Sequence, residues 1–207
     1  AISVDGTSGS ILMVGADGTP AGLASMYNDV AEAADLAIVA GVAPVETAAL
    51  GSTSPLARAL PVRGDGLRLL HQADWITGQL SGRFDVTDEN NALKTGYDPM
   101  SRRWPDWIAG TGLDVRSLPS VVPAGTRTGT IRAEMADRYG LPADAAIVAG
   151  TTDGCAAFLA SGFASRLAPE IRLLSWDTIR FSYITAALRY DGPRSNMRSA
   201  KKPVLVP

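Results

Sequence analysis

Several residue types on which common sites depend are almost absent from this sequence. Cys155 is the only cysteine and His71 the only histidine among 207 residues. A disulfide framework, a cysteine-based zinc site and a two-histidine metal site are therefore excluded. We assign no metal ligand to this chain and, from its cysteine usage, expect a reducing cytoplasm as its compartment.

The sequence also lacks a dominant charge and a long apolar run. Charged residues make up 19% of the chain, apolar residues 46%, and the formal net charge is −2. This balance is typical of a soluble globular protein and provides no basic field for nucleic acid. No apolar run approaches the ~20 residues that a membrane-spanning helix needs. We therefore expect neither a nucleic-acid nor a membrane partner.

The first ten residues, AISVDGTSGS, have none of the features of a signal peptide, because they contain no basic region and no cleavage pattern. They are typical of the middle of a β-strand region, with no preceding Met or cap. We expect from this that the chain is truncated at its start. Its length suits one domain or part of a larger one.

Short β-rich runs and helical stretches alternate along the chain, which is typical of an α/β fold. Strands are predicted at residues 2–5, 11–14 and 145–149, with a further short strand within 118–131. Helices are predicted at residues 28–41, 54–60, 67–80, 89–94, 132–142 and 155–161. Asn28 or Asp29 is the expected N-cap of the first helix, and Gly140 is expected to close the helix that starts at residue 132.

Residues 163–207 differ in composition from the rest of the chain. They contain eight of the nineteen Lys and Arg residues and few glycines. Because their hydrophobic periodicity is weak, we predict a poorly folded or disordered basic segment there. The alternative is a natural basic tail.

The motif VDGTSGS, residues 4–10, lies between the first two predicted strands. Gly6 and Gly9 permit positive φ angles and a close approach of the backbone, while Thr7 and Ser8 offer short hydrogen-bonding side chains. Such a loop suits a polyhydroxyl ligand or a phosphate. The alternative is a polar turn, because clusters of Gly, Ser and Thr are mostly loops.

A second motif, YNDV, begins at residue 27 and coincides with the expected helix start. In one interpretation Tyr27 and Asn28 reach into the same cleft as the loop at residues 6–10. In the other, Asn28 or Asp29 is a plain N-cap.

His71 has Asp74 three residues after it, a pair that could belong to a hydrolase. A Ser-His-Asp hydrolase also needs an exposed nucleophile in a Gly-x-Ser-x-Gly turn, which the sequence lacks. His71 is therefore predicted to be a hydrogen-bonded core residue. Asp74 and Asp88 are predicted to be helix caps or packed polar residues.

The motif AGTTDG, residues 149–154, follows a predicted buried strand and precedes a predicted helix. Asp153 is thus expected at a helix N-terminus, where backbone N–H groups stabilise a carboxylate and can hold an anion. An ionised acid beside such a loop suits a general base for a sugar hydroxyl in phosphoryl transfer. The alternative is that Asp153 only caps the helix.

Taken together, these loops resemble the N-terminal domain of the FGGY family of carbohydrate kinases. The resemblance rests on VDGTSGSILMVGADGTP, YNDV, LHQADWITGQLSGRFDVTDENNALKTGYD, WPDW, VVPAGTRTGTI and VAGTTDGCAAFLASG, whose order and spacing match over residues 1–162. VDGTS, LHQADW and GTTDG look closest to the D-ribulose kinase and xylulose-kinase-like branch. The family implies an α/β fold, a partial RNase H-like (actin-like ATPase) domain with a mixed sheet and flanking helices.

The resemblance also implies a reaction. Asp153 falls on the family's catalytic aspartate, which deprotonates the attacking sugar hydroxyl. Gly150, Thr151 and Thr152 lie where the phosphoryl group passes, and the implied cofactors are ATP and Mg²⁺. The implied partner is a small-molecule sugar, a ketopentose such as D-ribulose or D-xylulose.

Two further segments carry implied substrate contacts. Thr7 and Ser8 fall in the loop that contacts the sugar. Tyr27, Asn28 and Asp29 match the motif that closes the sugar pocket. An Arg that often follows this Asn-Asp pair is absent, and Ala31 and Glu32 stand there instead.

Two other departures concern the ends of the chain. The family's opening strand, with its Asp-x-Gly-Thr phosphate loop, is missing, and so are the Ser-Leu-Gly-Thr loop and the ATP-binding domain after Gly162. A shift of one nucleotide over residues 174–178 permits Ser-Leu-Gly-Thr, so a frameshift is our hypothesis for residues 163–207. We expect an ATP-dependent carbohydrate kinase present as an inactive fragment. The alternatives are a non-catalytic sugar-binding or regulatory module and a pseudogene product.

Overall fold

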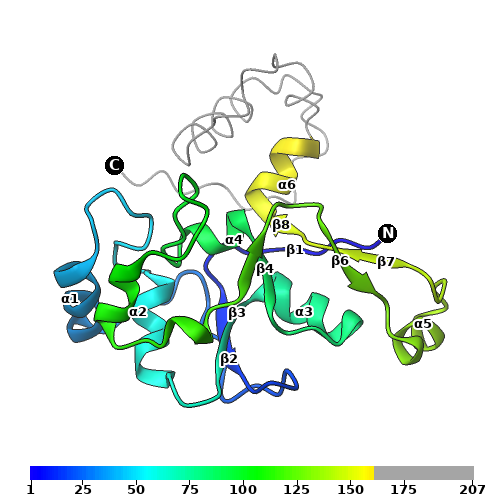
Figure 1. Cartoon of the computed structure of the whole chain (residues 1–207), viewed down its shortest axis with the longest axis horizontal. Helices are drawn as coiled ribbons and strands as arrows, with labels where there is room; N and C mark the ends of the chain where they lie inside the picture. The colour runs from blue at the N-terminus through cyan, green and yellow to red at the C-terminus, as the bar shows by residue number, and fades with distance from the viewer. Residues whose placement is uncertain (161–207) are drawn as a thin grey trace, which may run out of the picture. The chain divides into compact units, whose positions relative to one another are not determined.

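The computed structural model describes residues 1–160 (Figure 1). The predictions for residues 163–207 lie outside this range. The chain divides into two units, of which the first, Ala1–Ala156, contains all the predicted site residues. The described part of the second unit is the end of one helix.

The strands of the first unit form four two-stranded sheets, two parallel and two antiparallel. The parallel pairs are β1 (Asp5–Gly6) with β8 (Thr151–Thr152), and β4 (Val86–Asp88) with β5 (Ser120–Val122). The antiparallel pairs are β2 (Ile11–Val14) with β3 (Arg68–His71), and β6 (Arg127–Thr130) with β7 (Ala146–Val148). The predicted α/β class with mixed strand directions is confirmed.

Six α-helices and three short 3₁₀ helices accompany the strands in the described part of the chain. The α-helices are α1 (Ala33–Val42), α2 (Pro55–Ala59), α3 (Gln72–Ser81), α4 (Glu89–Leu93), α5 (Ala133–Tyr139) and α6 (Asp153–Ala160). The 3₁₀ helices are η1 (Leu60–Val62), η2 (Asp106–Thr111) and η3 (Val115–Ser117). Gly140 ends α5 in the left-handed conformation, as predicted.

The helix predicted over residues 67–80 begins later than expected, because its first part is strand β3. Leu69 and Leu70 are fully buried, and β3 pairs with β2 so that Ile11 lies opposite His71. A short apolar run bounded by turns suits a buried strand as well as a helix. The tertiary pairing with β2 decides in favour of the strand.

The helix predicted from residue 28 starts only at Ala33, with Glu32 as its N-cap. The prediction of Asn28 or Asp29 as the cap is therefore wrong. The carboxylate of Asp29 instead accepts a hydrogen bond from the backbone N–H of Met26 at 2.7 Å. A short acidic side chain that bonds to nearby backbone in this way competes with helix formation.

The hydrophobic core fixes the strands on which the candidate site depends. Leu56 of α2, Leu69 of β3 and Ile108 of η2 are each fully buried in the main cluster. A second cluster packs Ile131 and Ile147 beside α5. Burial of each such side chain stabilises the fold by about 1.5–3 kcal/mol.

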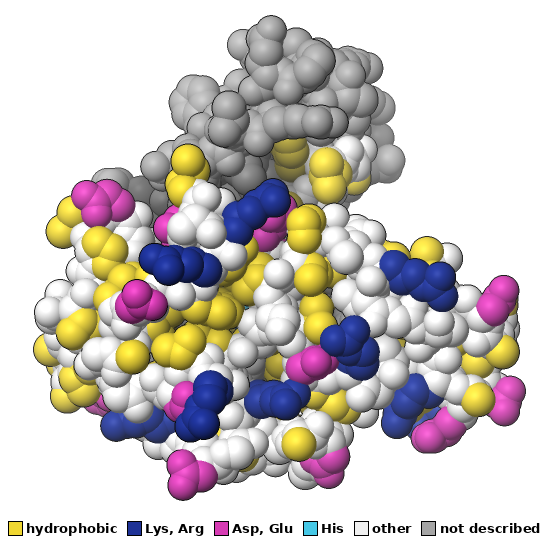
Figure 2. All heavy atoms as spheres, viewed as in Figure 1, with side chains coloured by type: hydrophobic (Ala, Val, Ile, Leu, Met, Phe, Trp, Pro, Cys, Tyr) yellow, Lys and Arg dark blue, Asp and Glu magenta, His cyan; other side chains and the backbone are white. Residues whose placement is uncertain are grey.

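One face of the described residues carries charges of both signs (Figure 2). Figure 2 shows one face on which Lys and Arg are interspersed with Asp and Glu, and apolar side chains gather over the α1 and α2 region. No helix within residues 1–160 has both the length and the hydropathy to cross a bilayer.

Candidate functional site

Pairing of β1 with β8 brings together two loops that are far apart in the sequence (Figure 1). The strands run parallel, with Asp5 opposite Thr151 and Gly6 opposite Thr152. Their carboxyl ends therefore meet at one edge, which is where open α/β sheets bind ligands. Thr7 follows one strand at this edge and Asp153 follows the other.

Asp153 is the first residue of α6, so the predicted strand-to-helix turn is confirmed. Its side chain is exposed, and its Oδ1 accepts a hydrogen bond from the N–H of Gly154 at 2.7 Å. Thr152 is buried, and its hydroxyl lies 3.4 Å from the N–H of Cys155. The carboxylate of Asp153 is thus held at the open edge of the sheet by its own helix start.

Gly150 allows the β8 turn to lie against the segment that enters β1. A Cβ atom added at Gly150 would lie 1.7 Å from the carbonyl oxygen of Val4, a distance that no side chain tolerates. The glycine is therefore required by packing alone, whatever passes over it.

The loop after β1 is fixed by α3. The N–H of Thr7 donates to Oε1 of Gln72 at 2.9 Å, and the N–H of Ser10 donates to the carbonyl of Thr7 at 3.1 Å. The buried Oγ of Ser8 has no hydrogen-bond partner in the described structure. An unpaired buried hydroxyl costs free energy, so Ser8 is suited to meet a ligand or a water molecule here.

Arg58 of α2 joins this loop to the segment that carries YNDV. One guanidinium nitrogen donates to Ser25 Oγ at 2.6 Å and to the carbonyl of Met26 at 2.8 Å. The other donates to the carbonyl of Gly9. Burial lowers the pKa of Arg58, and the charge of Asp29 opposes this shift. Sequence reasoning missed this residue, because nothing in the pattern of α2 distinguishes it from an exposed arginine.

Tyr27, Asn28 and Asp29 lie on the surface next to the same loop. The N–H of Tyr27 donates to Ser10 Oγ at 3.1 Å, which adds a second connection to residues 7–10. The loop at residues 7–10 leads back to β1, which pairs with β8 directly before Asp153. The segment at residues 27–29 thus contacts the loop at residues 7–10, and this loop follows the strand that pairs with β8. The roles of these residues in binding and catalysis stay predictions.

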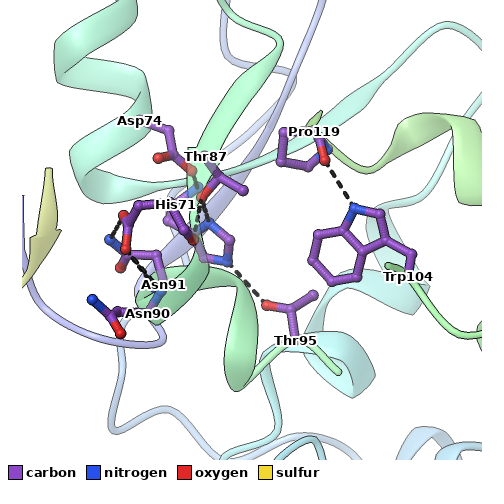
Figure 3. A network of polar contacts seen from close by, with 9 residues as sticks. His71, Asp74, Thr87, Asn90, Asn91, Thr95, Trp104 and Pro119 are labelled. Carbon is purple, nitrogen blue, oxygen red and sulfur yellow. Dashed lines mark hydrogen bonds and ion pairs between the residues drawn. The ribbon is translucent and has the colours of Figure 1, made fainter. Parts of the chain in front are cut away.

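His71 is a core residue, as predicted, and lies at the centre of a polar network (Figure 3). Its Nδ1 lies 2.7 Å from Asp74 Oδ2 and 3.0 Å from Thr87 Oγ1, and its Nε2 lies 3.0 Å from Thr95 Oγ1. Because a carboxylate oxygen accepts hydrogen bonds, Nδ1 is the ring nitrogen that donates to Asp74, and Nε2 is paired with the Thr95 hydroxyl. Every ring nitrogen is used, so His71 is not a free catalytic base.

Asp88 and α4 extend this network toward β8. Oδ1 of Asp88 caps α4 by accepting from the N–H groups of Asn90 and Asn91, at 2.9 and 3.1 Å. Its Oδ2 accepts from Nδ2 of Asn91 at 2.6 Å. Burial raises the pKa of Asp88, while the bond from the Asn91 side chain opposes this shift. Nδ2 of Asn90 in turn donates to Thr151 Oγ1 at 2.8 Å.

Asp153 lines neither of two hollows found among the described residues. The first is a cavity of about 20 Å³ beside Asp88 and Gly150, which is large enough for about one water molecule. The second is a groove of about 920 Å³ lined by Arg63, Asp65 and Arg116, among others. At the β1–β8 edge the Asp153 side chain itself is exposed. Residues 1–160 also contain no group of three or more acidic, His or Cys side chains able to hold a metal ion.

Residues 66–160 match the model of the FGGY family of carbohydrate kinases, N-terminal domain. This part of the chain is similar to the FGGY carbohydrate kinases. The match covers β8, Asp153 and the α3–α4 network, whereas the loop at residues 6–10 lies before it.

This chain covers about a fifth or less of the length of the curated relatives to which it is similar. Xylulose kinase of Lactococcus lactis is 31% identical over 105 residues, which cover 50% of this chain and 20% of the relative. Autoinducer-2 kinase of Yersinia enterocolitica is 38% identical over 88 residues, 40% of this chain and 16% of the relative.

Solved sugar-kinase structures match a larger share of the chain. Xylulose kinase from Rhodospirillum rubrum superposes with a TM-score of 0.68 and 23% identity, covering 78% of this chain and 36% of that protein. Plasmodium falciparum glycerol kinase with ADP gives a TM-score of 0.64 and 14% identity, at 78% and 36% coverage. At these identities the likeness shows the fold, and the expected actin-like ATPase class is confirmed.

Proposed function

We propose that this chain forms the sugar-binding part of an ATP-dependent carbohydrate kinase that phosphorylates a ketopentose hydroxyl. The observation that carries the proposal is the β1–β8 edge, where Asp153 and the Thr7–Ser8 loop follow adjacent parallel strands in an FGGY-like domain. An exposed carboxylate beside hydrogen-bonding loops suits proton abstraction from a polyhydroxyl substrate.

In the proposed reaction the Asp153 carboxylate accepts the proton of one sugar hydroxyl. The freed oxygen forms a bond to the γ-phosphorus of ATP while the bond from that phosphorus to the β,γ-bridging oxygen breaks, and ADP leaves. Because Oδ1 of Asp153 already accepts from Gly154, its Oδ2 is the atom we assign to the incoming proton.

The other predicted residues take supporting roles in this proposal. Thr7 and Ser8 bind the sugar, and the unpartnered Oγ of Ser8 supports that assignment. Tyr27, Asn28 and Asp29 close the sugar site from the neighbouring segment, and the bond from the N–H of Tyr27 to Ser10 Oγ supports this assignment.

The phosphoryl group passes over Gly150, Thr151 and Thr152 in this proposal. Gly150 presents no side chain there, and the positive end of the α6 dipole favours an anion. The Thr152 side chain is buried, so its contribution comes from the backbone. The co-substrate is ATP with Mg²⁺, an ion that proteins usually hold with one or two carboxylates together with the phosphates of the nucleotide.

The ketopentose assignment rests on the curated xylulose kinase relative. Because the described residues leave Asp153 exposed, we expect negligible turnover from this chain alone. A coupled assay of ADP release with D-xylulose and D-ribulose checks this, and turnover above the rate without sugar would contradict it.

The decisive experiment for the proposed function replaces Asp153→Asn in a full-length kinase built around this domain. The kinase proposal predicts a loss of kcat of about 10²–10⁴-fold, because a general base is removed, with sugar affinity largely retained. Asp137→Asn, which neutralises an exposed acid on α5, serves as the matched control and should leave kcat unchanged.

The second candidate is a non-catalytic sugar-binding or regulatory module, which is favoured by the bond between Asp153 and its own helix start. In that case the Asp153 carboxylate only stabilises the first turn of α6 through the N–H of Gly154, while the Thr152 hydroxyl accepts from the N–H of Cys155 as the cap. The same variant separates the candidates, since the module predicts that Asp153→Asn changes no activity.

A further inference from the structure

We propose that Asn90 is a positioning residue that fixes the Asp153-bearing turn by bonding to Thr151. This inference rests on the proposed function, because it assigns Asp153 as the group to be positioned. It adds a residue from outside the three loops that the sequence motifs singled out.

The turn that carries Asp153 has few anchors of its own. β8 is only two residues long and pairs with β1, which is equally short. The Asp153 side chain bonds to the adjacent N–H of Gly154, a contact that moves with the turn. The bond from Asn90 Nδ2 to Thr151 Oγ1, at 2.8 Å, joins this turn to an element 61 residues earlier.

The donor end of this bond is held rigidly. Asp88 caps α4 through the N–H of Asn90 itself, so the backbone of the positioning residue is fixed directly. The side chain of Asn91 is bonded to the other oxygen of Asp88. Both Asp88 and Asn91 are 1% exposed, so this cap is shielded from water.

The histidine network anchors both flanks of α4 (Figure 3). Thr87 lies two residues before α4 begins and bonds to Nδ1 of His71, while Thr95 lies two residues after α4 ends and bonds to Nε2. One fully buried imidazole ring therefore holds the two ends of the element that carries Asn90.

The short helix thus works as a fixed support for β8. Its buried face is tied to α3 and β4 by the polar network, and Asn90 is the part-buried side chain that reaches across to Thr151. A reacting group needs neighbouring residues that hold it in a narrow range of positions. Asn90 and α4 are placed to do this for the turn that carries Asp153.

The first experiment measures amide hydrogen exchange over residues 150–155 in the 207-residue chain without sugar. Asn90→Ala and Thr151→Val each remove one partner of the bond, and we expect about fivefold to tenfold faster exchange there. The double variant should exchange no faster than either single variant, because both remove the same bond. Thr151→Ser keeps the hydroxyl and should restore the original exchange rate.

Gln79→Ala, which shortens a part-buried amide side chain on α3, is the matched control and should leave exchange over residues 150–155 unchanged. The Gly154 amide resonance provides a spectroscopic readout, since its N–H donates to Asp153. It should shift in Asn90→Ala and not in Gln79→Ala. Unchanged exchange in Asn90→Ala, additive effects in the double variant, or an equal increase over α3 and α5 would each overturn the inference.

The second experiment measures the affinity of the same variants for D-xylulose and D-ribulose. Asn90→Ala and Thr151→Val should weaken binding by about fivefold, whereas Thr151→Ser should stay near the original affinity. Faster exchange with unchanged affinity would overturn the positioning role. A chain that binds neither sugar contradicts the proposed function, while the exchange experiment still decides whether Asn90 fixes the turn.

Discussion

Gly150 shows how a single residue can be explained by packing and by chemistry at once. The sequence motif suggests a place where a phosphoryl group passes, and the structure adds a near contact with the carbonyl of Val4. Packing is sufficient to require glycine at this position. A substitution at Gly150 therefore first disturbs the close packing against Val4, so its effect on activity would not by itself show a catalytic role.

We predict that Gly150→Ala destabilises the chain by about 1–3 kcal/mol, because the added methyl group forces β8 away from Val4. Urea unfolding monitored by circular dichroism measures this loss. Gly154→Ala is the matched control, since its Cβ would meet nothing within 4 Å and the position is helical. Alanine there should stabilise by about 0.5–1 kcal/mol. Equal losses in the two variants would contradict the packing account.

At the scale of elements, α4 depends on one buried acid. Asp88 accepts from two backbone N–H groups and from Asn91, yet burial raises its pKa above the ordinary 3.8. Because the pKa of Asp88 is higher in the folded state, Asp88 adds stability when the pH is below the pKa that this group has in the unfolded chain. This contribution is lost as the pH rises through the raised value.

We therefore predict that Asp88→Asn removes a pH dependence that the original chain shows. Relative to this variant, the original chain should lose stability as the pH rises from about 4 toward neutrality. Asparagine keeps a cap oxygen, whereas Asp88→Ala removes it and should cost about 1–2 kcal/mol. Unfolding curves across pH measure both effects. If the difference in unfolding free energy between the original chain and Asp88→Asn did not change with pH, the claim that burial raises the pKa of Asp88 would be contradicted.

Secondary structure was predictable from the sequence where local chemistry decides it. The stop of α5 at Gly140 and the start of α6 after β8 follow from glycine and from a strand-to-helix turn. Residues 67–71 were not predictable, because only the pairing with β2 makes them a strand. The late start of α1 likewise depends on a side-chain bond of Asp29 that competes with a helix start.

The candidate site was predictable only in part for the same reason. Asp153 and the loop at residues 6–10 carry recognisable motifs, so they could be selected in advance. Arg58 and Asn90 act through contacts with segments 49 and 61 residues away, for which a single sequence gives no signal. Their roles emerge from tertiary packing.

At the scale of the whole chain, the account depends on where a sugar binds. Asp153 is exposed at the β1–β8 edge, whereas a groove of about 920 Å³ lies near Arg63 and Arg116. A sugar that preferred the groove would separate binding from Asp153. The location of binding is therefore more informative than its strength.

The most direct measurement is a titration of the isotopically labelled chain with D-xylulose and D-ribulose, followed by amide chemical shifts. The account predicts saturable shifts at Thr7, Ser8 and Gly154, and no such response with an unrelated disaccharide. The assignment of the β1–β8 edge as a sugar site would be contradicted by saturable shifts confined to the groove around Arg63 and Arg116. It would also be contradicted if neither sugar caused saturable shifts.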